Sequence, residues 1–257
     1  MSILTSYTAV PEPLLRPGSK TGRSRIQGEI LSDDQVIEWK GLAARIRAVS
    51  IASFGPPPPL NHAVPVDNEH YVVATEAGVA ARINGRMLDP LGRLFAYQGH
   101  RLRFADRATG QKAIKGFEPD CIVQISADDG TCRVPGEFKT PWTTDLSDLD
   151  PDDELQVLAQ IAGYMNAYSC RFGFVCTYDA VILLKRVGTY RFMVSEPFKA
   201  IQPSSGASRN PQISATEALW WVALQARSNW KWTGPAADPN NLLDGSFILW
   251  HNLRNRR

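Results

Sequence analysis

The segment from Phe117 to Thr140 constrains the fold most, because it has the pattern of a β-hairpin with charged side chains on one face. A turn sequence at 127–130 (Ala-Asp-Asp-Gly) separates two apolar runs, whose members include Ile122, Val123, Ile125 and Val134. If this four-residue loop closes symmetrically, Asp120 lies opposite Glu137, with the two Cβ atoms about 5 Å apart. Lys139 then points to the same side as Glu137, because side chains alternate along a strand.

The alternative turn at Asp129-Gly130 would place Asp120 opposite Lys139, and all three charged side chains would still share one face. Phe138 points the other way, toward a core. Two neighbouring carboxylates repel each other unless a cation or a shared proton lies between them. The hairpin therefore predicts a metal site.

The composition fits an intracellular enzyme or binding protein without requiring either. The chain has 257 residues and 44% hydrophobic content, which is enough for one large or two small domains. Its net charge of +2 neither demands nor excludes a polyanionic partner. Apolar runs stay well below the roughly 18 residues of a membrane span, and the N-terminus lacks a signal-peptide pattern. We expect a soluble protein without membrane contact, in the cytoplasm or the nucleus. Its four cysteines are expected to be buried thiols, with a disulfide or a metal role as the less favoured alternative.

Four regions follow along the chain. Residues 1–30 are expected to form a flexible arm that is either solvated or in contact with phosphates through its scattered cations. Residues 31–60 are expected to hold a helix, which the capping box Ser32 to Gln35 opens and which runs to about Val49, and then a stiff spacer at Pro56 to Pro59. Residues 61–228 form the predicted main domain, and 229–257 form a C-terminal extension.

A second helix is expected from about Asp67 to Asp89, where Pro90 ends or kinks it. Glu76 falls within its apolar stripe, and a carboxylate among core-facing positions needs a partner. That partner is either a nearby arginine, Arg82 or Arg86, or the metal site.

The strand expected around 101–105 pairs beside the hairpin and begins a basic stretch. This stretch includes Arg101, Arg103, Lys112 and Lys115. These cations form either a surface for phosphates or an ordinary solvated face.

A third helix is expected from Asp150 to about Tyr168, since Asp at the N-cap, Pro at N1 and acids in the first turn all favour a helix start. Gln160 and Tyr164 lie four residues apart and so share a face of this helix. A strand pair at 171–186, a strand at 190–194 and a helix capped by Ser214 complete the expected elements.

These motifs together resemble the PD-(D/E)XK phosphodiesterase superfamily. Pro119-Asp120 matches the first motif of that family, and Glu137-Phe138-Lys139 matches the second. The segment from Gln160 to Tyr164 is similar to the Q-x-x-x-Y motif of its RecB and lambda-exonuclease branch. The similarity covers about residues 67–195. It implies an α/β (α+β) fold with a restriction-endonuclease-like αβββαβ core, in which helices flank a mixed central sheet.

The resemblance also implies a cofactor. Asp120 and Glu137 would ligate Mg²⁺ or Mn²⁺, and Glu76 would complete the site directly or through a water. Oxygen ligands in an incomplete protein cage suit Mg²⁺, which retains waters and takes a phosphate oxygen. The implied activity is a metal-dependent nuclease whose partner is nucleic acid, with DNA favoured over RNA.

The remaining site residues have roles that follow from the same resemblance. Lys139 would orient or activate the attacking water, while Gln160 and Tyr164 would position that water or the substrate. Two alternatives stay open at this point. One is a pseudonuclease that binds nucleic acid without cutting it, and the other is a protein-interaction domain on the same fold.

Overall fold

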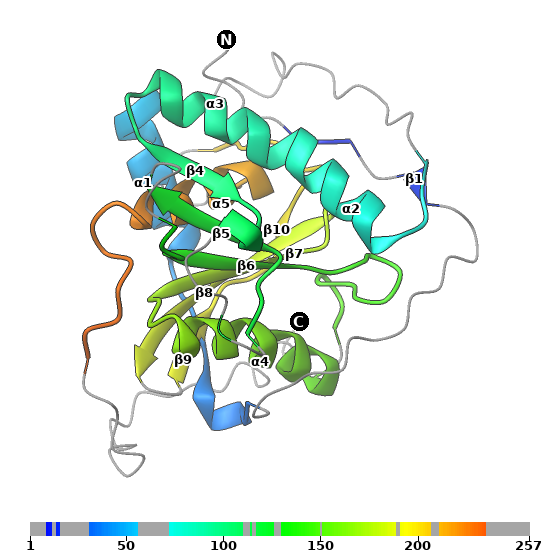
Figure 1. Ribbon diagram of the computed structural model, residues 1–257. Helices are drawn as coiled ribbons and strands as arrows, with labels where there is room; N and C mark the ends of the chain where they lie inside the picture. The colour runs from blue at the N-terminus through cyan, green and yellow to red at the C-terminus, as the bar shows by residue number, and fades with distance from the viewer. Residues whose placement is uncertain are drawn as a thin grey trace.

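A mixed, open β-sheet separates two helical layers in this α/β protein (Figure 1). The computed structural model describes residues 9–11, 14–15, 31–55, 72–109, 114, 117–125, 130–149, 151–188, 191–206 and 211–234. The predicted proline spacer at 56–59, the basic residues Lys112 and Lys115, and the predicted N-cap Asp150 lie outside these ranges.

The sheet has one continuous path of neighbouring strands. In spatial order these are β2 (Val36–Glu38), β9 (Arg191–Val194), β8 (Ala180–Gly188), β7 (Phe172–Cys176), β6 (Val134–Phe138), β5 (Cys121–Ile125) and β4 (Leu102–Ala105), while β10 (Phe198–Lys199) also pairs with β8. The pairs β6–β7 and β2–β9 are parallel, and the others are antiparallel. A separate parallel pair joins β1 (Leu14–Leu15) to β3 (Val72–Val73).

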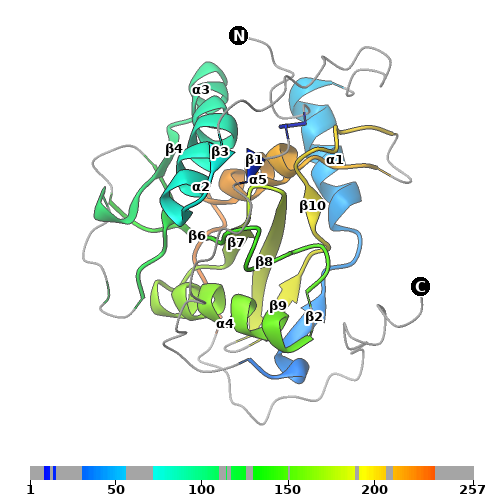
Figure 2. The same ribbon diagram turned by 90° about the vertical axis from the view of Figure 1, so that its right-hand side faces the viewer.

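Each face of the sheet has its own core (Figure 2). One face is covered by α1 (Leu42–Phe54), α2 (Glu76–Ile83), the π-helical segment η4 (Asn84–Leu88), α3 (Asp89–Tyr97) and α5 (Ala215–Gln225). The other face is covered by α4 (Pro151–Ala167), which buries Leu158, Ile161 and Met165 against Val175 of β7. Two short 3-10 turns, η2 (Asp33–Gln35) and η5 (Arg107–Thr109), complete the described elements.

The symmetric register predicted for the hairpin is confirmed. Cys121 pairs with Gly136, and Val123 pairs with Val134, so the next positions outward are Asp120 and Glu137. The helix predicted to end near Tyr168 and the strand pair within 171–186 are also present, as α4 and β7–β8. The Ser214 cap is confirmed, since its side chain accepts a hydrogen bond from the Glu217 amide at 3.1 Å.

The helix predicted to start at the Ser32 capping box was wrong. The capping contact itself forms, because the Ser32 amide donates to Gln35 Oε1 at 2.8 Å. It closes only the turn η2, however, and the chain then extends as β2 beside β9. The helix α1 starts later, at Leu42. Pairing with a strand more than 150 residues away in sequence overrides the local signal here.

The helix predicted from Asp67 to Asp89 is present from Glu76 onward, but its predicted start was wrong. Val72 and Val73 belong to β3, and α2 starts after Thr75, whose side chain accepts from the Gly78 amide at 3.1 Å. Pro90 does not end the helical path, because η4 changes the hydrogen-bond spacing just before it and α3 continues to Tyr97. Glu76 is the first residue of α2 and is exposed, so it is not among the core-facing positions.

Two described stretches of the predicted N-terminal arm contact the main body. Val10 is buried, and its amide donates to the carbonyl of Ala200 at 2.9 Å. Leu14 and Leu15 form β1. None of the helices in the described ranges combines the length and apolar character that a bilayer crossing requires.

Candidate active site

The hairpin β5–β6 places two carboxylates side by side at its open end. Asp120 directly precedes β5, and Glu137 lies on β6 at the opposing position. The backbone amide of Phe138 donates to Asp120 Oδ2 at 2.8 Å, which fixes the Asp120 carboxylate across the ladder. Asp120 is half-buried, whereas Glu137 is only 3% exposed.

The two oxygens of Glu137 have different environments. Oε1 accepts from Lys139 Nζ at 2.7 Å and from Gln160 Nε2 at 2.7 Å. Oε2 is buried and has no hydrogen-bond partner among the described residues. Burying a carboxylate oxygen without a hydrogen-bond donor costs free energy, and a proton or a cation bound to this atom would remove that cost.

The pKa of the Glu137 carboxyl reflects the same environment. This pKa is raised from its ordinary 4.5 to about 8, mainly by burial and then by the negative charge of Asp120. The ammonium of Lys139 acts in the opposite direction, but less strongly. The geometry therefore favours neutralisation of Glu137, by a proton when no metal is present.

The helix α4 supplies the polar side of the site. Gln160 accepts from Lys139 Nζ at 2.6 Å through Oε1 and donates from Nε2 to the Tyr164 hydroxyl at 2.9 Å. Tyr164 is buried, and that burial, followed by the charge of Glu137, raises the pKa of its hydroxyl. The tyrosine therefore stays protonated at neutral pH.

Close strand packing holds the charged residues of β6 in place. A Cβ atom at Gly136 would lie 2.2 Å from Cζ of Phe174 on β7, so this position has room only for glycine. The amide of Lys139 donates to the carbonyl of Cys176 at 3.0 Å just past the end of the parallel β6–β7 ladder. Together these contacts fix the backbone on both sides of Glu137.

The residues at the hairpin fit a hard divalent cation such as Mg²⁺ or Mn²⁺. Oε2 of Glu137, to which no described residue donates, can serve as an oxygen ligand, and the Asp120 carboxylate lies at the opposed position. Among the described residues, no three His, Cys, Asp or Glu side chains are grouped closely enough to hold a metal together. Glu76 accordingly does not join the other two carboxylates here, and no hydrogen bond or ion pair in the described ranges links it to them.

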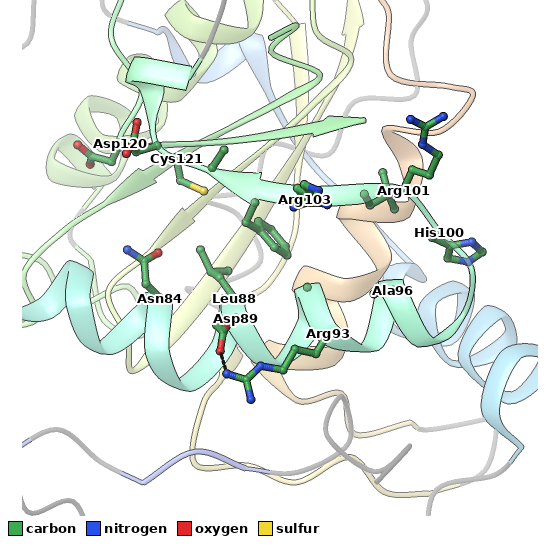
Figure 3. A pocket seen from close by; sticks show the side chains of 15 residues that line it. Asn84, Leu88, Asp89, Arg93, Ala96, His100, Arg101, Arg103, Asp120 and Cys121 are labelled. Carbon is green, nitrogen blue, oxygen red and sulfur yellow. Dashed lines mark hydrogen bonds and ion pairs between the residues drawn. The ribbon is translucent and has the colours of Figure 1, made fainter. Parts of the chain in front are cut away.

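A groove of about 760 Å³ leads along β4 to this site. Figure 3 shows the helical wall, with Asn84, Leu88 and Asp89, facing β4 across the groove. Asp120 and Cys121 lie at one end, and His100 and Arg101 lie at the other.

The predicted basic residues Arg103, on β4, and Arg101, which directly precedes it, both line this groove. Arg101 and Arg103 are exposed, and they alternate with Leu102 and Phe104, which pack toward the helical layer. Sequence reasoning missed the other lining residues, including Asn84, Arg93 and His100. They come from a helical stretch and a turn whose position beside β4 depends on tertiary packing, so no local pattern marks them.

Comparisons with protein-family models, with curated proteins and with solved structures found no match to this chain.

Proposed function

We propose that this protein is a metal-dependent nuclease that hydrolyses phosphodiester bonds, with DNA as the favoured substrate. The main support for the proposal is the hydrogen-bonding environment of the Glu137 carboxylate. Its Oε2 atom is buried at the position opposed to Asp120 and has no partner within the described part of the chain, while Oε1 is held by Lys139 and Gln160. This pattern is typical of a carboxylate prepared for a cation.

The order of elements supports placing the protein in the PD-(D/E)XK superfamily. The helical stretch from α2 to α3 is followed by β4, β5 and β6, then by α4 and β7, and this order supports the proposed αβββαβ core. The strands β4 to β7 are neighbours in this order, and β7 runs parallel to β6. The motif residues Asp120, Glu137 and Lys139 lie on this core, and Gln160 contacts the last two of them from α4.

In the proposed reaction Asp120 and Glu137 hold Mg²⁺ or Mn²⁺. Such an ion, when bound, offsets charge on the scissile phosphate and makes a nearby water more acidic. Lys139 is held by Glu137 and Gln160, so its ammonium is aligned to orient the attacking water and to stabilise negative charge that develops on the phosphate. Tyr164 fixes Gln160 and thereby the position of Lys139.

The test is incubation of the purified chain with linear, circular and single-stranded DNA and with RNA, in Mg²⁺, in Mn²⁺ or in EDTA. We expect cleavage only with a divalent cation. The isosteric variants Asp120→Asn and Glu137→Gln should lose at least about a hundredfold in rate, as expected for the loss of a group that stabilises transition-state charge. Lys199→Met, an exposed lysine on β10, serves as the control and should cleave like the wild type.

Cleavage that persists in EDTA, or that is unchanged in Asp120→Asn while that variant melts like the wild type, would contradict the proposal. Tight binding of DNA without cleavage would favour a pseudonuclease. Neither binding nor cleavage would favour a protein-interaction domain.

A further inference from the structure

The groove between α3 and β4 has a shape and a charge distribution that point to one kind of substrate. The acidic end holds Asp106 and Asp120, and the opposite end holds His100 and Arg101. Arg227 adds a cation at that second end, since its NH1 lies 3.4 Å from Nε2 of His100. On the helical wall Arg93 forms an ion pair with Asp89 at 2.5 Å. Its charge is therefore partly neutralised, and an anion that enters the groove is attracted mainly by Arg101 and Arg103.

The small volume of this groove favours a single strand over a duplex as its occupant. Its volume of about 760 Å³ lies in the range of small-ligand sites, and one wall is a helix packed directly on the strand that forms the other. The carboxylate Glu137 and the ammonium of Lys139 are 3% and 8% exposed, so a reacting phosphate must enter a narrow recess to reach them. A duplex, whose major groove alone is about 12 Å wide, would lie across the rim instead.

Arg101 and Arg103 are spaced for successive phosphates. Arg103 lies on β4 and Arg101 directly precedes this strand, so in an extended backbone their Cα atoms are about 6.6 Å apart. That distance is comparable to the spacing of neighbouring phosphates in an extended nucleic-acid strand. The register pairs Arg103 with Gln124, four residues from Asp120, so Arg103 lies about 13 Å along the strand direction from the carboxylates and Arg101 about 20 Å.

We propose that the groove along β4 binds a single nucleic-acid strand, with Arg103 and Arg101 contacting the phosphates two and three steps from the phosphate at Asp120. Half-buried Phe104, which follows Arg103 in sequence, lines the same groove and adds apolar surface. Strands of about five nucleotides or more reach both arginines, and shorter strands do not. This inference rests on the proposed nuclease function, because it takes the Asp120 end as the reacting end.

The experiment compares fluorescein-labelled thymidine oligomers of about three and about eight nucleotides with a blunt duplex that contains the longer sequence. Cleavage is measured in Mg²⁺, and binding is measured by fluorescence anisotropy in Ca²⁺ over a series of salt concentrations. The variants are Arg101→Gln and Arg103→Gln. The matched control is Arg45→Gln, which removes an exposed arginine from α1.

We expect the longer strand to be cleaved at least about tenfold more efficiently than the shorter strand and the blunt duplex, since it gains two charged contacts. Each arginine substitution should weaken binding of the longer strand and reduce its log–log salt slope by about 0.7, without changing cleavage of the shorter strand. Arg45→Gln should change neither.

Equal cleavage and binding of duplex and single strand would overturn the inference, as would arginine variants that behave like Arg45→Gln. In both cases the nuclease proposal would stand. Conversely, single-strand binding that depends on both arginines but occurs without any cleavage would support the groove as a strand site and remove the proposed nuclease activity.

Discussion

At the scale of single residues, Glu137 accounts for most of the chemistry proposed for this protein. It is the most buried acid of the site, it touches both Lys139 and Gln160, and one of its oxygens accepts no hydrogen bond from the described residues. Sequence alone placed it opposite Asp120, because hairpin register follows from the turn. The burial that changes its pKa depends on packing of α4 against β6 and β7, which the local sequence does not encode.

Metal affinity should depend on pH through Glu137. The pKa of this carboxyl is raised to about 8, so below that pH a cation must displace a proton to bind. Calorimetric titration with Mn²⁺ between about pH 6 and pH 8 should show affinity that rises by up to about tenfold per pH unit and levels off above about pH 8. Glu137→Gln should bind weakly at every pH. A wild-type affinity that stays constant over this range would contradict the assignment.

The stability of the metal-free protein should change with pH in the opposite direction. Because the folded-state pKa of Glu137 lies above its ordinary 4.5, this group stabilises the fold fully below about pH 4.5 and loses that contribution as the pH rises through about 8. Thermal denaturation in EDTA should therefore show a smaller loss of Tm between these pH values in Glu137→Gln than in the wild type. An identical loss in both proteins would show that Glu137 is not the group responsible.

Removal of the Lys139 ammonium should separate two effects. Lys139→Met should reduce kcat by at least about a hundredfold, because no other described side chain in contact with Glu137 and Gln160 carries a positive charge toward the phosphate. It should also raise the Mg²⁺ concentration needed for half-maximal rate at neutral pH, since Lys139 lowers the pKa of Glu137. Lys199→Met is the control. A change in kcat without a change in Mg²⁺ dependence would exclude the electrostatic link between the two residues.

At the scale of elements, the sequence was most informative where a local signal and a long-range contact agree. Pro151 and the acids after it predicted α4, and the hairpin turn predicted the β5–β6 register. Two helix predictions failed where strand pairing overrides the local pattern. After the Ser32 capping box, Val36 to Glu38 pair with β9, and before Thr75, Val72 and Val73 pair with β1. Strand pairing of this kind is set by residues far away in sequence, so a local pattern cannot reveal it.

The contact between β6 and β7 gives a sharp test at this scale. Gly136→Ala should destabilise the protein by about 1–3 kcal/mol, the usual cost of overpacking, because its Cβ would overlap the Phe174 ring. The double variant Gly136→Ala with Phe174→Leu should recover part of that loss. Gly92→Ala on α3 is a matched control: the added methyl group would have no neighbour within 4 Å, and the variant should be neutral or slightly stabilising. Denaturant unfolding measures all three, and equal stability of Gly136→Ala and wild type would contradict the packing argument.

At the scale of the whole molecule, a buried ion pair ties the helical layer together on the face opposite α4. Arg47 of α1 and Glu217 of α5 are both fully buried, with NH2 to Oε2 at 3.2 Å. Arg47 also donates to the carbonyls of Gly206 and Gln212, at 3.1 and 2.6 Å. The pair therefore joins two helices and the connection before α5, far along the chain from the site residues on β6 and α4.

Loss of this pair should affect folding rather than chemistry. Arg47→Met should lower the free energy of unfolding by about 3–5 kcal/mol, because it leaves the Glu217 carboxylate buried without its cation. Arg45→Met, two residues earlier on α1 and exposed, should change it by less than about 0.5 kcal/mol. The double variant Arg47→Met with Glu217→Leu should be more stable than Arg47→Met alone. If Arg47→Met had the same free energy of unfolding as Arg45→Met, the Arg47–Glu217 ion pair would not contribute to stability.

The central claim, that Asp120 and Glu137 form the metal centre of a nuclease, is tested most directly by anomalous diffraction from crystals of the protein soaked in Mn²⁺. The account predicts one strong anomalous peak between the Asp120 carboxylate and Oε2 of Glu137, and no such peak in crystals of Glu137→Gln. A map without a peak at this position, or with the same peak in the variant, would contradict it.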